Sequence, residues 1–315
     1  MFALARKLRE KGVLGLNRRN ADYILPVNAR HLYPLVDDKL LTKELALKAK
    51  IAVPQLYGVI ESAGDVRKVR DIVAGHDSFA VKPTKGSGGE GIIVVTDRVH
   101  GVFAKASGAL ITLAALEFHI QNALSGIYSL GGQPDKVMIE QCVTFDPVFE
   151  KITYQGVPDV RVIVYRGIPV MAMVRLPTRL SGGRANLHQG AIGAGIDMDT
   201  GKTLTAVLRN EIVDEHPDTF NKVSGVSIPY WERILNISAI TYELTGLGYQ
   251  GVDIVLDSSH GPLVLELNAR PGLNIQIANR AGLLPRLEAV DARKSRRKSP
   301  VARRVKFARE NFRTA

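Results

Sequence analysis

The stretch that decides the fold is Gly251-Val-Asp-Ile-Val-Leu-Asp-Ser-Ser-His-Gly-Pro-Leu-Val-Leu-Glu-Leu-Asn-Ala-Arg-Pro-Gly272, which reads as a β-hairpin with acidic residues inside apolar strands. Side chains alternate between the faces of a strand, so Asp253 shares a face with Glu266 and Asn268, opposite the aliphatic residues. The turn register places Asp253 across from Glu266. Because like charges facing each other destabilise a hairpin, a cation is expected between them. Carboxylate and amide oxygens suit Mg²⁺; alternatively, both acids simply face solvent.

Size and composition are those of a soluble globular protein. The chain has 315 residues, 45% of them hydrophobic and 23% charged, which is enough for two domains and a sizeable core. Cys142 is the only cysteine, so no disulfide can form within the chain. The first ten residues lack the apolar core of a signal peptide, and no apolar run is long enough to span a membrane. We therefore expect a cytoplasmic protein.

The positive charge is concentrated at the C-terminal end. The net charge is +11, and residues 289–315 hold ten Lys or Arg against two acids, which leaves only +3 for the body. We expect this basic tail to be solvated and partly disordered. Alternatively, Val301, Val305, Phe307 and Phe312 would give it a weak amphipathic helix. The tail is a candidate contact for an acidic partner, an anionic membrane surface or nucleic acid.

The periodicity of apolar residues and the turn signals predict an α+β fold with antiparallel sheet rather than a doubly wound parallel fold. The predicted helices are 2–11, 38–50, 64–74, 113–124 and 230–245, with an irregular segment at 15–20. The predicted strands are 56–60, 79–82, 92–95, 137–143, 159–165 and 168–175, and a further hairpin turns at 199–202. Asp38 is expected to cap its helix, and Leu40, Leu41, Leu45 and Leu47 are expected to form its apolar face.

A glycine-rich loop, Lys82-Pro-Thr-Lys-Gly-Ser-Gly-Gly-Glu-Gly91, joins two of the predicted strands. Its glycines allow backbone N–H groups to approach phosphate oxygens closely, and Ser87 and Lys82 add a hydroxyl and a charge. The spacing is not that of a Walker A loop, and a strand rather than a helix follows. We expect a hinged flap over a triphosphate; an ordinary flexible hairpin loop is the alternative.

Other polar groups occur at strand ends and in loops. Glu140 and Gln141 close an apolar strand and could bind an adenine edge, although a buried strand running into a loop explains them equally well. Asp159 and Arg161 share one face of the next strand. Arg161, Arg175 and Arg184 suit carboxylate or phosphate recognition. In a glycine-flanked loop, Arg184, Asn186 and His188 alternate and could point the same way.

Taken in order, these motifs resemble the ATP-grasp superfamily, specifically the ribosomal-protein glutamate ligase (RimK-like) branch and its α-L-glutamate ligase-like subgroup. The resemblance covers about residues 37–282. The motifs that carry it are Asp38-Lys39-Leu40, Val81-Lys82, Gly86–Gly91, Ile139–Val143, Asp159-Val-Arg161, Arg184-Ala-Asn-Leu-His188, Gly251-Val-Asp253 and Glu266-Leu-Asn268 followed by Pro271-Gly272.

The resemblance implies an ATP-grasp fold in which two α+β lobes grip ATP. It implies a short N-terminal extension (1–37), an N-lobe (38–145) with the glycine flap (86–91), a C-lobe (146–288) and the basic tail (289–315). Relatives usually carry an N-terminal α/β domain, and only 37 residues precede Asp38 here. We therefore expect that domain to be shortened or absent, with a partner protein or second subunit completing the acceptor site.

The resemblance also implies roles for individual residues. The ATP phosphates would be held by Lys39, Lys82 and the flap residues Ser87, Gly88 and Gly89. The adenine would be bound by Glu140, Gln141 and Cys142. Other parts of the nucleotide would be bound by Asp159, Arg184 and Asn186. Asp253, Glu266 and Asn268 would hold two Mg²⁺ ions, with Mn²⁺ as an alternative. Arg270 continues the metal face and is expected to clamp the carboxylate or acyl phosphate; Arg184 and Arg161 are the other candidate catalytic residues.

The function that the resemblance implies is ATP-dependent carboxylate–amine ligation. A carboxylate, of an amino acid such as glutamate or of a peptide, would be activated as an acyl phosphate. An amine acceptor would then form an amide, with release of ADP and phosphate. We expect a homo-oligomer. The alternatives are a non-catalytic nucleotide-binding module that regulates a partner, and a nucleic-acid-binding protein that acts through the basic tail.

Overall fold

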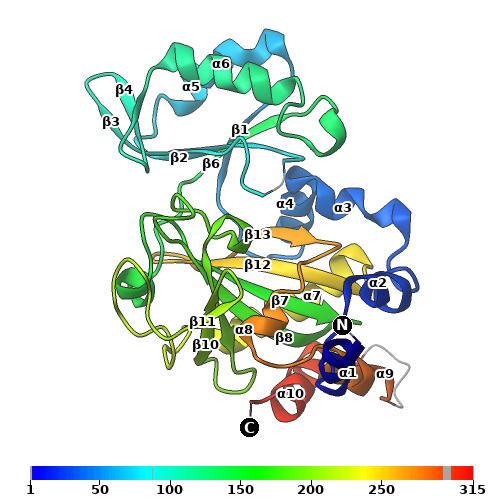
Figure 1. The fold of residues 1–315 in the computed structure, drawn as a ribbon. Helices are drawn as coiled ribbons and strands as arrows, with labels where there is room; N and C mark the ends of the chain where they lie inside the picture. The colour runs from blue at the N-terminus through cyan, green and yellow to red at the C-terminus, as the bar shows by residue number, and fades with distance from the viewer. Residues whose placement is uncertain (1, 87, 294–298, 315) are drawn as a thin grey trace.

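Two antiparallel sheets, each with its own hydrophobic core, organise the chain into two α+β lobes. The computed structural model describes residues 2–86, 88–293 and 299–314. The smaller lobe lies at the top of Figure 1 and the larger lobe below it, with helix α4 (Lys39–Lys48) between them. The predicted α+β class with antiparallel sheets is confirmed.

The smaller lobe contains a six-stranded sheet in the order β1-β6-β2-β3-β4-β5. Its strands are β1 (Leu56–Ile60), β2 (Phe79–Pro83), β3 (Ile93–Val99), β4 (Val102–Lys105), β5 (Leu110–Ile111) and β6 (Val137–Glu140). Helices α5 (Val69–Val73) and α6 (Leu113–Leu124) cover one face of this sheet (Figure 1). Phe79 and Phe103 pack edge to face in the core, with ring centroids 5.2 Å apart.

The larger lobe contains a seven-stranded sheet in the order β11-β10-β9-β8-β7-β12-β13. Its strands are β7 (Asp159–Tyr165), β8 (Ile168–Leu176), β9 (Ile192–Ile196), β10 (Thr203–Leu208), β11 (Glu211–Val213), β12 (Tyr249–Asp257) and β13 (Gly261–Asn268). Helix α7 (Trp231–Thr245) packs against β7, β8 and β12, and α8 (Ile275–Ala278) against β8, β9 and β10. Every residue of β12 is consequently buried.

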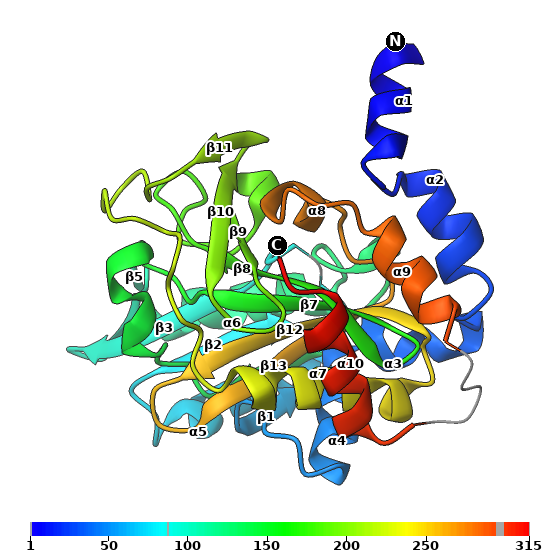
Figure 2. The ribbon, with the colours of Figure 1, turned by 90° about the horizontal axis from the view of Figure 1, so that it is seen from below.

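The N-terminal segment is tied to the larger lobe by reciprocal hydrogen bonds. It contains α1 (Phe2–Glu10), α2 (Leu16–Arg18), a π-helix (Arg19–Ile24), a 3-10 helix (Arg30–Leu32) and α3 (Pro34–Asp37). The buried Asn28 side chain donates to the Tyr249 carbonyl (2.7 Å) and accepts from the Tyr249 N–H (2.9 Å). Gln276 makes the same kind of pair with Leu14, at 2.8 and 3.0 Å. Figure 2 shows α1 projecting from the body of the molecule.

Three sequence predictions about these elements are wrong. Residues 16–20 are helical rather than irregular, and residues 63–73 form a 3-10 helix followed by α5 rather than one α-helix. Asp38 caps α4 as expected, accepting from Leu40 N at 2.9 Å. However, α4 buries Thr42, Lys43 and Ala46, while Leu47 is 57% exposed. The cause is that α4 turns a polar face toward the space between the lobes instead of packing an apolar stripe on one core.

The prediction of a solvated, partly disordered tail is also wrong for the part of the tail that the structure describes. Residues 301–311 form helix α10 (Val301–Asn311), which packs against α7 and β8 (Figure 2). Val305, Ala308 and Phe312 are buried, and the buried Arg304 guanidinium donates to the Gly167 carbonyl at 3.0 Å. Basic residues thus pair with the protein's own acids, as Arg304 does with Glu243 at 2.8 Å. Among the described residues, no helix is long and apolar enough to cross a membrane.

Candidate active site

A cluster of charged side chains lies on one face of the larger sheet, where β8, β7, β12 and β13 run side by side. One row of directly opposite residues joins Met173, Arg161, Asp253 and Glu266. Residues opposite each other in an antiparallel sheet share a face, so these four side chains lie together. The predicted register of Asp253 against Glu266 is therefore confirmed. The cluster is called the carboxylate–arginine cluster below, and comprises Asp159, Arg161, Arg175, Asp253, Glu266 and Asn268.

Two arginines hold the carboxylates at the centre of this cluster. The Arg161 guanidinium binds Asp253 in bidentate fashion, with Nε 2.7 Å from Oδ1. Arg175 bridges two acids, since it binds both oxygens of Asp159 and places Nη2 2.9 Å from Asp253 Oδ2. Bidentate arginine–carboxylate pairs are among the strongest hydrogen-bonded contacts in proteins and also fix orientation. The arrangement therefore makes a rigid, almost solvent-free platform.

Burial and charge act on these two carboxyls with different outcomes. Burial raises the pKa of Asp253, but Arg161 and Arg175 outweigh burial and hold the pKa well below its usual range. Burial also raises the pKa of Asp159, and the neighbouring Asp253 charge adds to it, so that the value reaches about 6 despite Arg175. The cluster thus keeps Asp253 as an anion and leaves Asp159 able to change charge near neutral pH.

Glu266 and Asn268 form the more open edge of the cluster. The Glu266 side chain is 33% exposed and lies 3.8 Å from Lys39 Nζ and 4.0 Å from Arg161 Nη2. The Asn268 amide nitrogen lies 3.1 Å from Glu266 Oε1. This leaves the Asn268 carbonyl oxygen and the Glu266 carboxylate as hard-oxygen ligands. Asp253 Oδ2, by contrast, already accepts from both arginines and Asn268.

The oxygen donors of the cluster fit the expected Mg²⁺ only in part. In the described parts of the chain, no group of three or more His, Cys, Asp or Glu side chains could hold a metal ion. Glu266 and Asn268 nevertheless fit Mg²⁺, because this ion commonly takes one or two carboxylates and fills its remaining positions with phosphate oxygens and water. Asp253 fits only as a ligand through Oδ1, which accepts a single hydrogen bond from Arg161.

On the smaller lobe, a buried Glu140 lies between two lysines. Lys82 binds Glu140 Oε1, and Lys43 of α4 lies 2.8 Å from Glu140 Oε2. Burial raises the pKa of Glu140, but the two lysine charges outweigh burial and lower it. Its neighbour Gln141 pairs with the backbone of Gln55, donating its N–H to the carbonyl at 2.8 Å. Cys142 is half-buried next to this strand end, and burial raises its thiol pKa.

The glycine flap reaches across from the smaller lobe to the larger one. Asn186 Nδ2 donates to the Gly88 carbonyl at 3.2 Å, and the aliphatic part of Arg184 lies beside Gly89. Lys39 Nζ binds the Gly86 carbonyl, so that Lys39 connects the flap with Glu266. Ser87 lies outside the described residues. The structure thus brings Lys39, Gly88, Gly89, Arg184 and Asn186 together at the edge of the cluster.

Two of the predicted residues are placed differently from the expectation. Arg270 is exposed and its guanidinium lies over the Tyr33 ring, 5.3 Å from the ring centroid. Tyr33 precedes α3, so Arg270 faces the N-terminal segment. Arg184, Asn186 and His188 do not point the same way, because residues 187–189 form a 3-10 helix and His188 lies in a separate pocket.

Sequence reasoning missed the contacts of three polar residues that shape the site. Arg175 was expected to recognise a carboxylate or phosphate but was given no partner, although its register opposite Asp159 follows from the predicted hairpin turn at residues 166–167. Lys43 carried no signal, since its contact with Glu140 depends on how α4 packs between the lobes. Asp135 anchors the flap base, accepting from Thr84 Oγ1 at 2.7 Å. A single buried acid in a loop has no pattern that reveals such a role.

The fold and this cluster define an ATP-grasp protein, with two α+β lobes, a glycine flap and acidic strand residues between them. The chain belongs to the sugar-transfer associated ATP-grasp family, whose model matches residues 18–292. The resemblance to the ATP-grasp superfamily is thereby confirmed. The association with sugar transfer was not expected from the sequence.

The chain is also similar to curated ligases. It is 23% identical over 250 residues to a "Probable alpha-L-glutamate ligase" of Pseudomonas putida (strain GB-1), covering 79% of this chain and 61% of the relative. It is 23% identical over 281 residues to "Probable alpha-L-glutamate ligase 1" of Hahella chejuensis, covering 89% of this chain and 71% of the relative. The expected likeness to α-L-glutamate ligases is thus found. The chain spans about three fifths of the length of the Pseudomonas relatives.

Similar solved structures include the ATP-grasp ligase PsnB complexed with minimal precursor, with a TM-score of 0.45 and 17% identity over 84% of this chain and 63% of that chain. D-cycloserine synthetase DcsG gives a TM-score of 0.47 and 15% identity, over 84% of this chain and 72% of that chain. PsnB has also been described with Mg and ADP. These TM-scores and sequence identities are low, and the chain belongs to the family because the family model matches residues 18–292.

Proposed function

We propose that this protein is an ATP-dependent carboxylate–amine ligase that works through an acyl phosphate. The observation that carries the proposal is the carboxylate–arginine cluster facing the flap, with Lys39 bridging the Gly86 carbonyl and Glu266. Membership of the ATP-grasp family and the similarity to glutamate ligases support it. Glutamate is the carboxylate that we propose first, and ADP and phosphate are the other products.

We assign different roles to the acidic, the basic and the backbone groups of the site. Glu266 and Asn268, with Asp253 through Oδ1, would hold Mg²⁺, which when bound neutralises phosphate charge and polarises the transferred group. Lys39, Lys82 and the N–H groups of Gly88 and Gly89 are proposed to hold the phosphates. Arg161 and Arg175 keep Asp253 fixed and ionised. Asp159 acts through Arg175 as a positioning residue.

The remaining assignments are proposals of the same kind. The adenine would bind beside Glu140, Gln141 and Cys142, at the end of β6. Arg184 and Asn186 would close the flap over the phosphates. Arg270 would reach the substrate only by leaving its place over Tyr33. The boundaries 1–37, 38–145, 146–288 and 289–315 are proposed as the functional divisions of the chain.

In the chemical step, a carboxylate oxygen of the substrate attacks the γ-phosphorus of ATP, and the bond to the β,γ-bridging oxygen breaks to release ADP. A neutral amine then attacks the acyl carbon. The carbon–oxygen bond to phosphate breaks, phosphate leaves with the electron pair, and the amine nitrogen loses a proton. The cationic groups around the γ-phosphate stabilise the charge that develops there.

The proposal is tested by measuring ADP release with Glu266→Gln across a panel of amino acids and short peptides. We expect at least a 100-fold loss of turnover, because the change removes a charge needed at the reacting phosphate. The Glu266 side chain is 33% exposed and lies 3.8 Å from Lys39 and 4.0 Å from Arg161, so the loss of stability should stay within about 1 kcal/mol. Glu211→Gln, an exposed strand carboxylate on β11, is the matched control. Unchanged turnover in Glu266→Gln would contradict the proposal.

A non-catalytic nucleotide-binding module remains the rival reading. It predicts ATP binding by calorimetry without ADP release for any member of the panel. No observation in the described part of the structure favours nucleic-acid binding through the tail over docking of that tail on its own lobe.

A further inference from the structure

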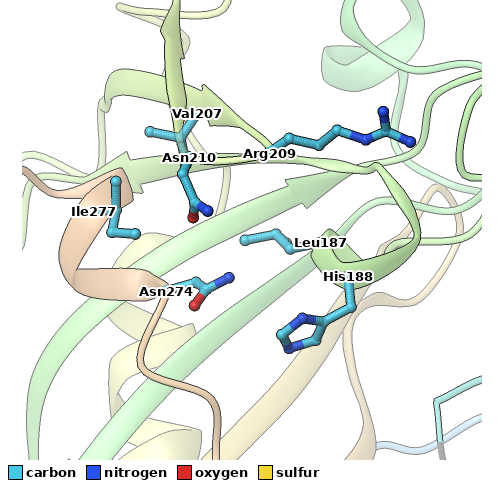
Figure 3. Close-up of a pocket in the computed structure, with 7 residues that line it drawn as sticks. All are labelled: Leu187, His188, Val207, Arg209, Asn210, Asn274 and Ile277. Atoms are coloured by element: carbon cyan, nitrogen blue, oxygen red, sulfur yellow. The ribbon is translucent and has the colours of Figure 1, made fainter. Parts of the chain in front are cut away.

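A pocket of about 200 Å³ opens on the larger lobe, outside the carboxylate–arginine cluster (Figure 3). Four segments build it: strand β10, the β10–β11 turn, the start of α8 and the 3-10 helix at residues 187–189. Its lining residues are Leu187, His188, Val207, Arg209, Asn210, Asn274 and Ile277.

Strand register fixes where this pocket lies relative to the cluster. Val207 of β10 lies opposite Gly193 of β9, Gly193 opposite Arg175 of β8, and Arg175 opposite Asp159 of β7. The pocket floor and the carboxylate–arginine cluster therefore share one face of the sheet. Two strand spacings separate Val207 from Arg175, which is roughly 10 Å. A small molecule in the pocket can thus extend toward Arg175, at the near edge of the carboxylate–arginine cluster.

Local backbone features position the polar groups. Arg209 and Asn210 form the two-residue turn between β10 and β11, both with positive φ (48° and 71°), as in a type I′ hairpin. Asparagine tolerates this conformation well. Leu187 packs directly over Gly193, where an added Cβ would lie 2.8 Å from Leu187 Cδ2. Asn274 stands at the start of α8 without making a capping hydrogen bond.

The lining favours an uncharged, hydroxyl-bearing ligand. Figure 3 shows the Asn210 and Asn274 amides entering the space from opposite sides, beside Leu187 and Ile277, while the Arg209 guanidinium points away. Among the residues that the structure describes, no acidic side chain lines the pocket. Each amide offers a donor and an acceptor, as each hydroxyl does, whereas a carboxylate only accepts. Apolar floor atoms suit the C–H face of a ring.

We propose that this pocket binds the acceptor of the ligase reaction, and that the acceptor is a hydroxyl-rich amine of the amino-sugar class rather than a free amino acid. The inference rests on the proposed function. The ring hydroxyls would bind Asn210 and Asn274, and the neutral amine would project along the sheet toward Arg175. The amine nitrogen forms the new bond to the acyl carbon, phosphate leaves, and the nitrogen loses one proton.

The test separates activation from acceptor use. With glutamate and ATP, hydroxylamine traps an acyl phosphate as the hydroxamate without any acceptor in the pocket. ADP release is then measured with glucosamine, galactosamine and mannosamine, and in parallel with glycine, alanine and lysine. We expect at least one amino sugar to accelerate ADP release more than every amino acid does.

Two variants and a control locate the effect. Asn210→Ala and Asn274→Ala should each raise KM for the amino sugar about 10-fold, the loss expected for hydrogen bonds to the ligand, and leave the hydroxamate rate within 2-fold. Asn236 is a half-buried asparagine on α7 whose amide bonds to the Glu232 carbonyl of the same helix, so Asn236→Ala should change neither KM for the amino sugar nor the hydroxamate rate. Thermal denaturation confirms folding.

Three results would overturn the inference: hydroxamate formation with no acceleration by any amino sugar, preferential acceleration by amino acids, or unchanged KM in both pocket variants. Absence of hydroxamate with glutamate and every other carboxylate of the panel is a different failure. It contradicts the proposed function itself and removes the acceptor assignment with it.

Discussion

At the scale of single residues, the central feature is the balance of charge around Asp253. Three carboxylates, Asp159, Asp253 and Glu266, face three cations, Arg161, Arg175 and Lys39. Removing one partner of a buried pair leaves an uncompensated charge, so the members of such a cluster depend on one another. The balance also means that the cluster does not repel a polyanion, which a face of bare carboxylates would do.

Asp159 gives the cluster a pH dependence that can be measured. Its pKa is raised from 3.8 to about 6, so the folded state holds a proton that the unfolded state has already lost between these values. The resulting stabilisation is complete below pH 3.8 and disappears as the pH rises through 6. The free energy of unfolding should therefore fall from pH 4 to pH 7 relative to Asp159→Asn, by on the order of 2 kcal/mol.

Urea denaturation of both proteins at half-unit pH steps checks this expectation. The lowered pKa of Asp253 acts below pH 4, outside the window, and so does not mask the effect. A wild-type curve parallel to that of Asp159→Asn between pH 4 and 7 would contradict the assignment.

Residue-level prediction from the sequence succeeded where alternation along a strand decides the outcome. The pairing of Asp253 with Glu266 required only the turn length and the two-residue period of the hairpin. Arg270 follows the end of β13 at Asn268 by two residues and stacks on Tyr33, so its expected contact with the substrate stays a prediction. Periodicity has no meaning beyond the end of the strand.

At the scale of elements, the flap depends on a close contact at its end. Gly91 has a φ of +71°, and a Cβ there would lie 2.5 Å from the Tyr128 ring. The Gly91 carbonyl also contacts His119 Nε2 of α6, at 2.8 Å. The flap is therefore seated on α6 and on the loop that follows it.

Gly91→Ala should destabilise the protein by about 2–4 kcal/mol and raise KM for ATP. The backbone strain of a non-glycine residue contributes about 1 kcal/mol, and the clash with Tyr128 contributes the rest. Gly101→Ala is the matched control, because Gly101 has a φ of +82° and no heavy atom within 4 Å of an added Cβ. Denaturation and ATP kinetics on both variants are the measurements. Equal effects of the two substitutions would show that the Tyr128 contact is unimportant.

Element boundaries were predictable where strong local signals exist, as for the Asp38 cap of α4 and the hairpin turn at residues 166–167. The buried face of α4 was not predictable. Thr42, Lys43 and Ala46 are buried because α4 meets Glu140 from one lobe and β13 from the other. The leucine pattern alone therefore predicted the wrong face of α4 to be buried.

At the scale of the whole molecule, the C-terminal helix completes the larger lobe. Arg304 is 4% exposed and its guanidinium binds the carbonyls of Gly167 and Ala239 and the Glu243 carboxylate. Sequence composition could not reveal this docking, since ten basic residues in the final segment obscure the few apolar positions that are buried. The antiparallel α+β class, by contrast, followed from hairpins spread along the chain.

Arg304→Ala should lower the free energy of unfolding by about 2–4 kcal/mol, because two buried carbonyls lose a donor. Arg303→Ala removes an equal charge from an exposed position on the same helix and should change stability by less than about 0.5 kcal/mol. Chemical denaturation of the full chain distinguishes them. Similar stability of the two variants would mean that α10 does not dock as described.

The central claim, that the site activates a carboxylate as an acyl phosphate, is tested most directly by isotope transfer. The protein is incubated with ATP, glutamate labelled with ¹⁸O in its carboxylates, and hydroxylamine, and the released phosphate is analysed by mass spectrometry. The mechanism predicts one ¹⁸O atom in each phosphate, because the carboxylate oxygen that attacks the γ-phosphorus leaves with it. ADP formed together with unlabelled phosphate would contradict the account.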